Sequence, residues 1–224
     1  MLVLENIKKF YKIGPIKIEV LKDISLEIQD KELVSIIGAS GCGKSTLMHI
    51  MGLLDQPTSG TYFLDGEDVF KLDDNQLSVL RNKKIGFVFQ AFYLLPRLTA
   101  IENVALPLTY RDGIKKKDIE ELCWYYLKRV KMDNRAYHKP NELSGGQQQR
   151  IAIARALVTE PSVLFADEPT GALDSKVGQE IMDLFIELNE ERGITTVIIT
   201  HDMNIAKQCR RIIYMADGIL REEI

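Results

Sequence analysis

The alternation of apolar and polar side chains predicts that the chain begins with short strands separated by polar turns. Residues 24–28 read Ile-Ser-Leu-Glu-Ile, an alternation typical of a strand with one buried face. Residues 33–37 form a short apolar run, directly before a glycine-rich loop. Residues 60–69 and 85–89 have the composition of further strands, whereas residues 47–54 indicate a helix. The N-terminal part of the chain is therefore predicted to be rich in strands.

Two longer segments have the apolar spacing of amphipathic helices. Residues 178–192 place Ile181, Leu184, Phe185 and Leu188 on one face, and Gly193 is expected to end this helix. Residues 115–132 also place a set of apolar side chains on one helix face: Ile119, Leu122, Cys123, Tyr126, Leu127 and Val130. Both segments are therefore predicted to be helices that bury one face.

Two continuous apolar runs, residues 163–166 and 195–199, are typical of parallel strands that helices cover on both faces. The chain thus has a strand-rich start, a helical middle at about residues 91–157, and a remainder in which strands and helices alternate. This order predicts an α/β fold with a mostly parallel sheet.

Composition narrows the classes of partner. The 224 residues are 46% hydrophobic, enough for a sizeable core, and the net charge is −3. A net negative charge argues against nucleic acid as the main partner, because proteins that bind the phosphate backbone usually carry a basic surplus. The sequence has no apolar run of about 18 residues, the length needed to span a bilayer.

The N-terminus and the cysteines bear on the compartment. Residues 1–5 lack a basic flank followed by an apolar stretch, so no signal peptide is predicted. Cys42, Cys123 and Cys209 are scattered and have no ligand-like spacing. This usage suits a reducing cytoplasm and argues against structural zinc.

The strongest candidate for chemistry is the loop that follows the apolar run at residues 33–37. It fits the pattern G-x-x-x-x-G-K-[ST], in which backbone N–H groups and a helix N-terminus surround a phosphate. Lys44 would contact the β- and γ-phosphates and Ser45 would bind Mg²⁺; the alternative is an ordinary glycine turn. The candidate phosphate-binding residues are Gly38, Ala39, Ser40, Gly41, Cys42, Gly43, Lys44, Ser45 and Thr46.

Two carboxylates end the apolar run at residues 163–166. Asp167 can bind Mg²⁺, because this cation prefers oxygen ligands, and Glu168 is placed to act as a general base on water. The alternative is a solvated acidic turn after a strand.

A second glycine-rich turn precedes a predicted helix in the middle of the chain. Its residues are Leu143, Ser144, Gly145, Gly146 and Gln147. A serine hydroxyl and two glycines at a helix start can bind an anion, although a plain N-cap at Ser144 explains the same residues. Two phosphate sites on different helices of one chain fit best if two chains share one nucleotide.

Taken together, these motifs resemble the nucleotide-binding domain of an ABC ATPase. The loop at residues 38–46 resembles Walker A, residues 163–168 resemble Walker B, and residues 143–147 match the LSGGQ signature. Ala39 and Cys42 depart from the usual Pro and Ser of the family's loop. Both positions act mainly through backbone N–H groups, so nucleotide binding is still expected.

The resemblance assigns further residues. Gln90 matches the Q-loop glutamine that helps hold Mg²⁺, residues 172–174 resemble the D-loop, and His201 resembles the switch histidine at the γ-phosphate. Tyr11 stands where the family stacks an aromatic ring on adenine, with Phe10 as the neighbouring alternative.

The resemblance also implies an architecture. It is a P-loop NTPase core with a mostly parallel sheet, an N-terminal antiparallel β subdomain and an inserted α-helical subdomain. Residues 1–224 would form a single domain, with the core and β subdomain at about 1–90 and 158–224. The helical subdomain, which carries the signature, would span about 91–157.

The implied function is ATP hydrolysis with Mg²⁺ at the interface of a head-to-tail homodimer. Glu168 and His201 would be the catalytic residues, and Ser144, Gly145, Gly146 and Gln147 would come from the opposite protomer. The ATPase would be a peripheral subunit on the cytoplasmic face of the cell membrane, where it drives a separate transmembrane permease. Nucleic acid is not expected to be a partner.

Within the family, residues 86–90 and 94–104 resemble the macrolide-export and lipoprotein-release group, so export or extraction of a drug, peptide or lipoprotein is expected. The alternative is a mechanical or regulatory module that gates a membrane complex without moving a solute.

Two local features complete these expectations. Residues 92–96 are too apolar for a solvated loop and would either contact the permease or pack internally. The thiol of Cys42, at a helix N-terminus beside Lys44, gives the hypothesis that alkylation inactivates the enzyme and that ATP protects it; the alternative is a small residue that the loop tolerates.

Overall fold

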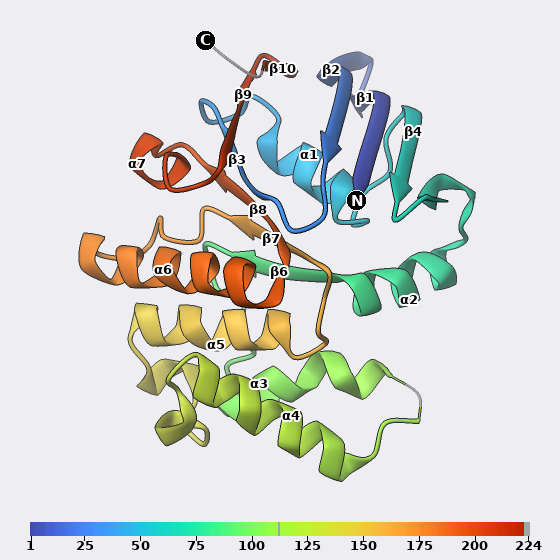
Figure 1. The fold of residues 1–224 in the computed structure, drawn as a ribbon. Coiled ribbons are helices and arrows are strands. Elements are labelled where there is room, and N and C mark those ends of the chain that lie inside the picture. The colour runs from blue at the N-terminus through green and yellow to red at the C-terminus, as the bar shows by residue number, and fades with distance from the viewer. Residues whose placement is uncertain (112, 222–224) are drawn as a thin grey trace.

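The computed structural model describes residues 1–111 and 113–221 and contains two sheets (Figure 1). The four-stranded sheet has the order β2-β1-β4-β5, and the six-stranded sheet has the order β10-β9-β3-β8-β7-β6. The strands of the first sheet are β1 (Leu2–Ile13), β2 (Ile16–Ile28), β4 (Ser59–Leu64) and β5 (Glu67–Asp68). Those of the second are β3 (Leu33–Ile37), β6 (Ile85–Phe89), β7 (Val163–Asp167), β8 (Thr195–Thr200), β9 (Arg211–Ala216) and β10 (Ile219–Arg221).

The antiparallel sheet corrects one prediction. The N-terminal strands are not short: β1 has 12 residues and β2 has 13, and they pair as one long hairpin. Bulges interrupt the register between Leu4 and Ile7, and again before Lys9, so the alternation of apolar residues is broken within a single strand. The predicted strand at residues 60–69 is also too long, since β4 ends at Leu64.

The six-stranded sheet is parallel from β9 to β6, and only β10 is antiparallel to its neighbour. Alternate residues of β7 enter different cores. Val163 and Phe165 pack in the hydrophobic cluster that includes the antiparallel sheet, and Leu164 and Ala166 pack in the cluster of the helices on the other face. The prediction of strands buried on both faces is confirmed.

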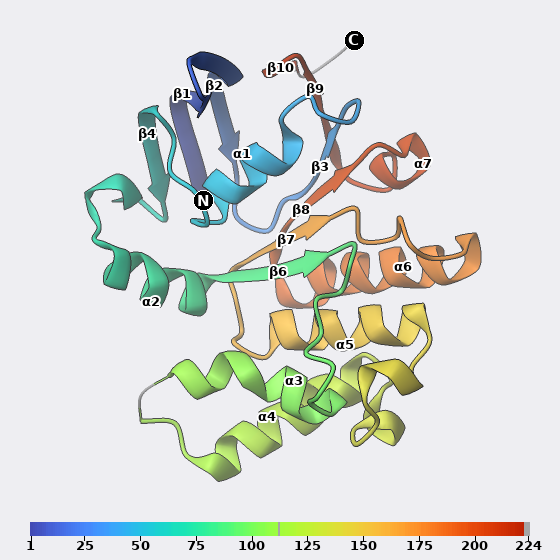
Figure 2. The same ribbon diagram turned by 180° about the vertical axis from the view of Figure 1, so that it is seen from behind.

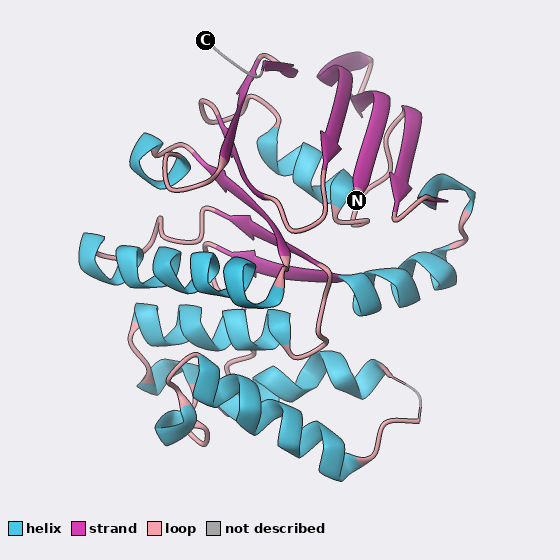
Figure 3. Ribbon diagram, in the orientation of Figure 1, coloured by secondary structure: helices cyan, strands magenta, loops and turns pink. Residues whose placement is uncertain are grey.

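The helices lie on both faces of this sheet. Helix α1 (Lys44–Met51) lies between the two sheets, and α6 (Ser175–Arg192) and α5 (Gly145–Leu157) follow on the opposite face, with α3 and α4 beyond them (Figure 2). Figure 3 shows the separation of the strand-rich and the helical parts. The remaining helices are α2 (Asp74–Lys84), α3 (Ala100–Ala105), α4 (Lys116–Arg129), α7 (Met203–Ala206) and the 3₁₀ turns η1 (Val69–Lys71), η2 (Leu106–Tyr110), η3 (Asp133–Arg135) and η4 (Pro140–Glu142).

The predicted helices are present with shifted ends. Helix α4 buries Cys123, Tyr126 and Leu127, and α6 ends at Gly193 with a φ of 64°, the left-handed conformation that glycine favours. Helix α2 has no amphipathic pattern, because Leu77 is its only buried residue. The boundaries of the helical subdomain, at about residues 91 and 157, stay a prediction. Residues 112 and 222–224 of the predicted single domain lie outside the described part of the chain.

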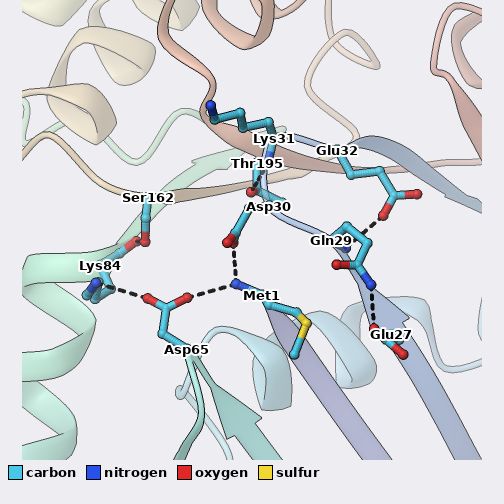
Figure 4. A network of polar contacts seen from close by, with 10 residues as sticks. All are labelled: Met1, Glu27, Gln29, Asp30, Lys31, Glu32, Asp65, Lys84, Ser162 and Thr195. Atoms are coloured by element: carbon cyan, nitrogen blue, oxygen red, sulfur yellow. Dashed lines mark hydrogen bonds and ion pairs between the residues drawn. The ribbon is translucent and has the colours of Figure 1, made fainter.

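A polar network ties the antiparallel sheet to the six-stranded sheet (Figure 4). The amino group of Met1 contacts Asp30 and Asp65, and Lys84 Nζ lies 2.9 Å from the Asp65 carboxylate. The backbone N–H of Lys31 donates to Thr195 Oγ1 at 2.9 Å. The network connects the start of β1 to the β2–β3 turn and to the end of α2.

Candidate nucleotide site

Strand register brings the candidate residues to one edge of the parallel sheet. Phe89 pairs with Asp167, Asp167 pairs with Ile199, and Ile37 pairs with Thr200. The segments that follow these strand ends therefore meet, as expected for the carboxyl edge of a parallel sheet, where ligands bind in open α/β folds. These segments carry Gly38, Gln90, Glu168 and His201.

The glycines of the loop at residues 38–46 have specific packing. A Cβ on Gly38 would lie 2.1 Å from the carbonyl oxygen of Met215, and one on Gly43 would lie 3.0 Å from that of Val20. Gly43 has a φ of 109° and is the N-cap of α1, whereas Gly41, at a φ of 79°, faces open space. The loop is therefore held against β2 and β9 while its rim, with Ala39 and Ser40, stays exposed.

Lys44 and Ser45 occupy the first turn of α1. Lys44 is 7% exposed, and its ammonium donates to the carbonyl oxygens of Gly38 (2.8 Å) and Ala39 (2.9 Å). The ammonium is thus held inside the loop. Ser45 Oγ donates to Asp167 Oδ2 at 3.2 Å, which brings together two of the three predicted Mg²⁺ ligands.

Cys42 lies in the same loop and is half-buried, whereas Cys123 and Cys209 are buried. Burial raises the pKa of both the Cys123 and the Cys209 thiols to about 11, so these two are poor nucleophiles at neutral pH. We expect N-ethylmaleimide to modify Cys42 first, and ATP to protect it by filling the loop. Mass spectrometry of the modified protein and its ATPase activity provide the measurement.

The matched control is Cys42→Ser, which should retain turnover and resist the reagent. Full modification of Cys42 without a change in turnover, or equal inactivation of the Cys42→Ser protein, contradicts the expectation.

Asp167 is a partly desolvated carboxylate. Burial raises its pKa, the hydrogen bond from Ser45 opposes this, and the nearby negative charge of Glu168 adds to it. The neighbouring His49 and Lys44 lower the pKa again. An acidic group in this setting favours a cation at its free oxygen.

Both the side chain and the backbone of Glu168 make hydrogen bonds. Its Oε1 lies 2.7 Å from His201 Nδ1, and Thr200 Oγ1 donates to Oε2 at 3.4 Å. The backbone N–H of Glu168 donates to Ile199 O at 2.8 Å, and its φ is 47°, a left-handed conformation that costs a non-glycine residue about 1–3 kcal/mol. Other residues of the described chain also have positive φ. Glu168 differs because it follows a buried strand and carries the candidate base.

The structure brings Gln90 to the loop that follows Glu168. A Cβ on Gly171 would lie 2.9 Å from Gln90 Nε2, so the Gln90 amide lies against this glycine where the two loops meet. The predicted D-loop continues from there, and Asp174 caps α6 by accepting from the N–H of Val177 at 3.0 Å.

Ser144 is the N-cap of α5, a helix that lies on the opposite face of the sheet from α1 (Figure 1). Ser144 and Gln147 form a reciprocal capping box, so the capping role considered for Ser144 is present. A Cβ on Gly146 would lie 2.4 Å from Val177 Cγ1, and one on Gly145 would lie 3.5 Å from Leu173. The turn is therefore packed on the start of α6 and is not part of the Lys44 loop within one chain.

Tyr11 lies beside the end of the phosphate loop. Its hydroxyl donates to Asp55 Oδ2 at 2.8 Å, and Lys9 Nζ lies 4.9 Å from the ring centroid. Burial and the contact with Asp55 raise the Tyr11 pKa, and a hydrogen bond with Thr46 opposes them. The ring of Phe10 has Lys17 Nζ at 3.7 Å from its centroid, so a lysine ammonium lies over each of the two rings, and the choice of Tyr11 as the stacking residue stays a prediction.

The apolar segment at residues 92–96 packs internally in part, and its contact with a permease stays a prediction. Leu94 packs against the helical cluster, whereas Tyr93 is 64% and Leu95 43% exposed. Arg155 of α5 donates to the carbonyl oxygen of Phe92 at 2.7 Å and fixes the backbone here.

Sequence reasoning missed Thr200 and Asp55. Thr200 had a signal, since it precedes His201 at the end of an apolar strand. Asp55 had none, because its contacts with Lys9 and Tyr11 join residues more than forty positions apart.

The fold and the site define a phosphate-loop α/β protein with a signature turn on a separate helix. The chain belongs to the ABC transporter family, whose model matches residues 21–171. Among the described residues, none of the helices has the length and apolar character to cross a membrane.

Similar proteins agree with this assignment. The lipoprotein-releasing system ATP-binding protein LolD of Aquifex aeolicus is 50% identical over 220 residues, covering 98% of this chain and 96% of that protein. The macrolide export ATP-binding/permease protein MacB of Syntrophobacter fumaroxidans is 48% identical over 224 residues. This chain spans 31% of that MacB's length.

One of the solved structures similar to this chain is the ATP-binding cassette MJ0796 of Methanocaldococcus jannaschii, a dimeric post-hydrolysis state bound to ADP and Pi. The TM-score is 0.92 at 50% identity, covering 100% of this chain and 98% of that one. The predicted fold class, an α/β core with an antiparallel N-terminal sheet, is confirmed.

Proposed function

We propose that this protein binds ATP with Mg²⁺ and hydrolyses it at the interface of a head-to-tail homodimer, to drive a separate transmembrane permease. The observation that carries the proposal is the meeting of the Lys44 loop, the Ser45–Asp167 pair and the Glu168–His201 pair at one sheet edge. Phosphoryl transfer to water needs these elements: a phosphate cradle, a cation site and a positioned base.

The residues present fit the magnesium ion. Ser45 Oγ and Asp167 Oδ2 are oxygen ligands 3.2 Å apart, next to the loop that would hold the phosphates, and Gln90 lies at the neighbouring strand end. When bound, the ion neutralises charge on the β- and γ-phosphates. The chain's own part is to hold its ligands in place, and the hydrogen bond between Ser45 and Asp167 does so.

In the proposed reaction, the N–H groups of the loop and Lys44 bind the phosphates, which displace the Gly38 and Ala39 carbonyls from the ammonium. Tyr11 stacks on adenine. Glu168 accepts a proton from the attacking water, and His201, 2.7 Å from that carboxylate, orients it and contacts the γ-phosphate. Ser144, Gly145, Gly146 and Gln147 of a second protomer close the site. Within one chain they lie on the other face of the sheet, which is why a second copy is needed.

The names of similar proteins suggest which process the ATPase drives. The names of MacB and LolD refer to macrolide export and lipoprotein release. We therefore propose that this protein drives export or extraction of a substrate of that kind. The exposed Tyr93 and Leu95, beside Gln90, offer a docking place for the permease on the cytoplasmic face of the membrane. A module that gates a membrane complex without transport would use the same catalytic residues.

The test is phosphate release by the purified protein with ATP and Mg²⁺, compared with EDTA and with Asp167→Asn. We expect metal-dependent turnover that Asp167→Asn reduces by about 10²-fold or more, because the cation loses its charged ligand. Absence of metal-dependent turnover at every protein concentration contradicts the proposal.

A further inference from the structure

Gln149 is a buried amide that none of the motifs explains. It lies on α5, is 0% exposed, and its Nε2 donates to the carbonyl oxygen of Pro169 at 2.6 Å. Its Oε1 is buried and has no hydrogen-bond partner among the described residues. Since a buried polar atom without a partner is unfavourable, the residue is not a generic way to fill the core.

The carbonyl that Gln149 holds belongs to the residue after Glu168. Pro169 is buried and follows the end of β7, so its carbonyl has no ladder partner of its own. The neighbouring carbonyls are bonded within the loop, where the N–H of Gly171 donates to Glu168 O at 3.0 Å and that of Leu173 to Thr170 O at 3.0 Å. Gln149 therefore supplies the link between this loop and a different helix.

That helix carries the signature turn. Ser144 caps α5 and Gln149 lies five positions further along, about 7 Å along the helix axis. Gly146 lies between them, and a Cβ on this glycine would clash with the side chain of Val177 at the start of α6. One short, rigid piece of α5 thus contacts both ends of the loop that begins with Glu168 and ends in α6.

We propose that Gln149 is a positioning residue for the Glu168 carboxylate, acting through the Pro169 peptide. This role rests on the proposed function, because it assumes that Glu168 is the base. The left-handed φ of 47° at Glu168 is held on one side by the bond to Ile199 and on the other by the Pro169 carbonyl. Removing the Gln149 donor releases the second anchor, so the carboxylate loses its position while the phosphate loop stays intact.

The first test is Gln149→Met, which keeps the length and removes the donor. We expect kcat to fall by about 10- to 100-fold, since small misplacements of a catalytic group have effects of this size. The dissociation constant for ATP, measured with a fluorescent analogue, should change by less than about two-fold, because the phosphate contacts are untouched. A fall in affinity as large as the fall in kcat overturns the role.

The second test is Gln149→Glu. The ionised side chain cannot donate to Pro169, whereas the protonated one can, and burial raises the pKa of such a carboxyl. The ratio of variant to wild-type kcat should therefore rise as pH is lowered from about 8 to 6. A ratio that is flat, or falls with decreasing pH, overturns the role.

Asn189 provides a matched control. It is 3% exposed, donates to two backbone carbonyls, and its Oδ1 is also without a partner in the described part of the chain. It lies near the far end of the 18-residue helix α6, about 20 Å along the axis from Asp174. We expect Asn189→Leu to lower the melting temperature as Gln149→Met does, but to leave kcat within about two-fold of wild type.

An equal loss of kcat in Asn189→Leu shows that general destabilisation explains both variants and overturns the inference about Gln149. Failure of this inference is distinct from failure of the proposed function. In the first case the wild-type protein hydrolyses ATP and Gln149→Met does so equally well. In the second case the wild-type protein releases no phosphate.

Discussion

Glu168→Gln is expected to lower kcat by about 10²- to 10⁴-fold, the usual contribution of a general base, while ATP binding stays within about two-fold of wild type. The amide keeps the size of the side chain and can still contact His201, whose Nδ1 lies 2.7 Å from Oε1. It cannot accept a proton from water. The measurement is phosphate release under steady-state conditions, together with ATP affinity by equilibrium titration.

The same variant is expected to accumulate as a dimer when ATP and Mg²⁺ are present. If ATP is bound between two copies and hydrolysis separates them, blocking hydrolysis leaves the closed state populated. Sedimentation at several protein concentrations, with ATP or ADP, measures this. Mass close to that of one chain under all conditions contradicts the shared site.

Glu160→Gln is the matched control for this experiment. Glu160 is also a glutamate with positive φ, at 52°, but it is exposed and its carboxylate contacts the Tyr126 hydroxyl at 3.4 Å. We expect turnover near that of wild type. A comparable loss in Glu160→Gln shows that exchange of a carboxylate for an amide lowers turnover even away from the site, and it removes the support for Glu168 as the base.

Much of the site could be predicted from sequence because its parts are local in the chain. The loop at residues 38–46 and the carboxylates after β7 need only a strand followed by a short segment, and the register of parallel strands then brings them together. The same reasoning placed His201 at the end of β8. These residues depend on the order of strands and not on details of packing.

Contacts between distant elements could not be predicted in this way. Gln149 reaches Pro169 across twenty positions, and Tyr11 reaches Asp55 across forty-four. A glutamine in an amphipathic helix has the same sequence signal whether it faces water or a carbonyl in the core. The long β1–β2 hairpin was missed for a related reason, because bulges that depend on the partner strand break its alternation.

Mixing two inactive variants tests the head-to-tail arrangement directly. Lys44→Met removes the cation of the phosphate loop, and Ser144→Leu removes the hydroxyl of the signature turn; each alone should lose about 10²-fold or more in turnover. Lys44 is buried within its own loop and Ser144 is exposed, so the two changes act at separate surfaces of one chain. If each site takes Lys44 from one copy and Ser144 from the other, a mixed dimer has one site with both defects and one with neither. Random pairing of equal amounts then restores about a quarter of wild-type turnover.

The control mixture is Lys44→Met with Glu168→Gln. Both residues belong to the same half of the site, since Ser45 of the Lys44 loop bonds to Asp167, the neighbour of Glu168. Every site in that mixed dimer carries one defect, so no turnover should return. Recovery in both mixtures contradicts the arrangement, because it means that single chains or exchanged subunits supply complete sites. Recovery in neither mixture contradicts it as well, since a shared site requires that the Lys44→Met and Ser144→Leu copies complement each other.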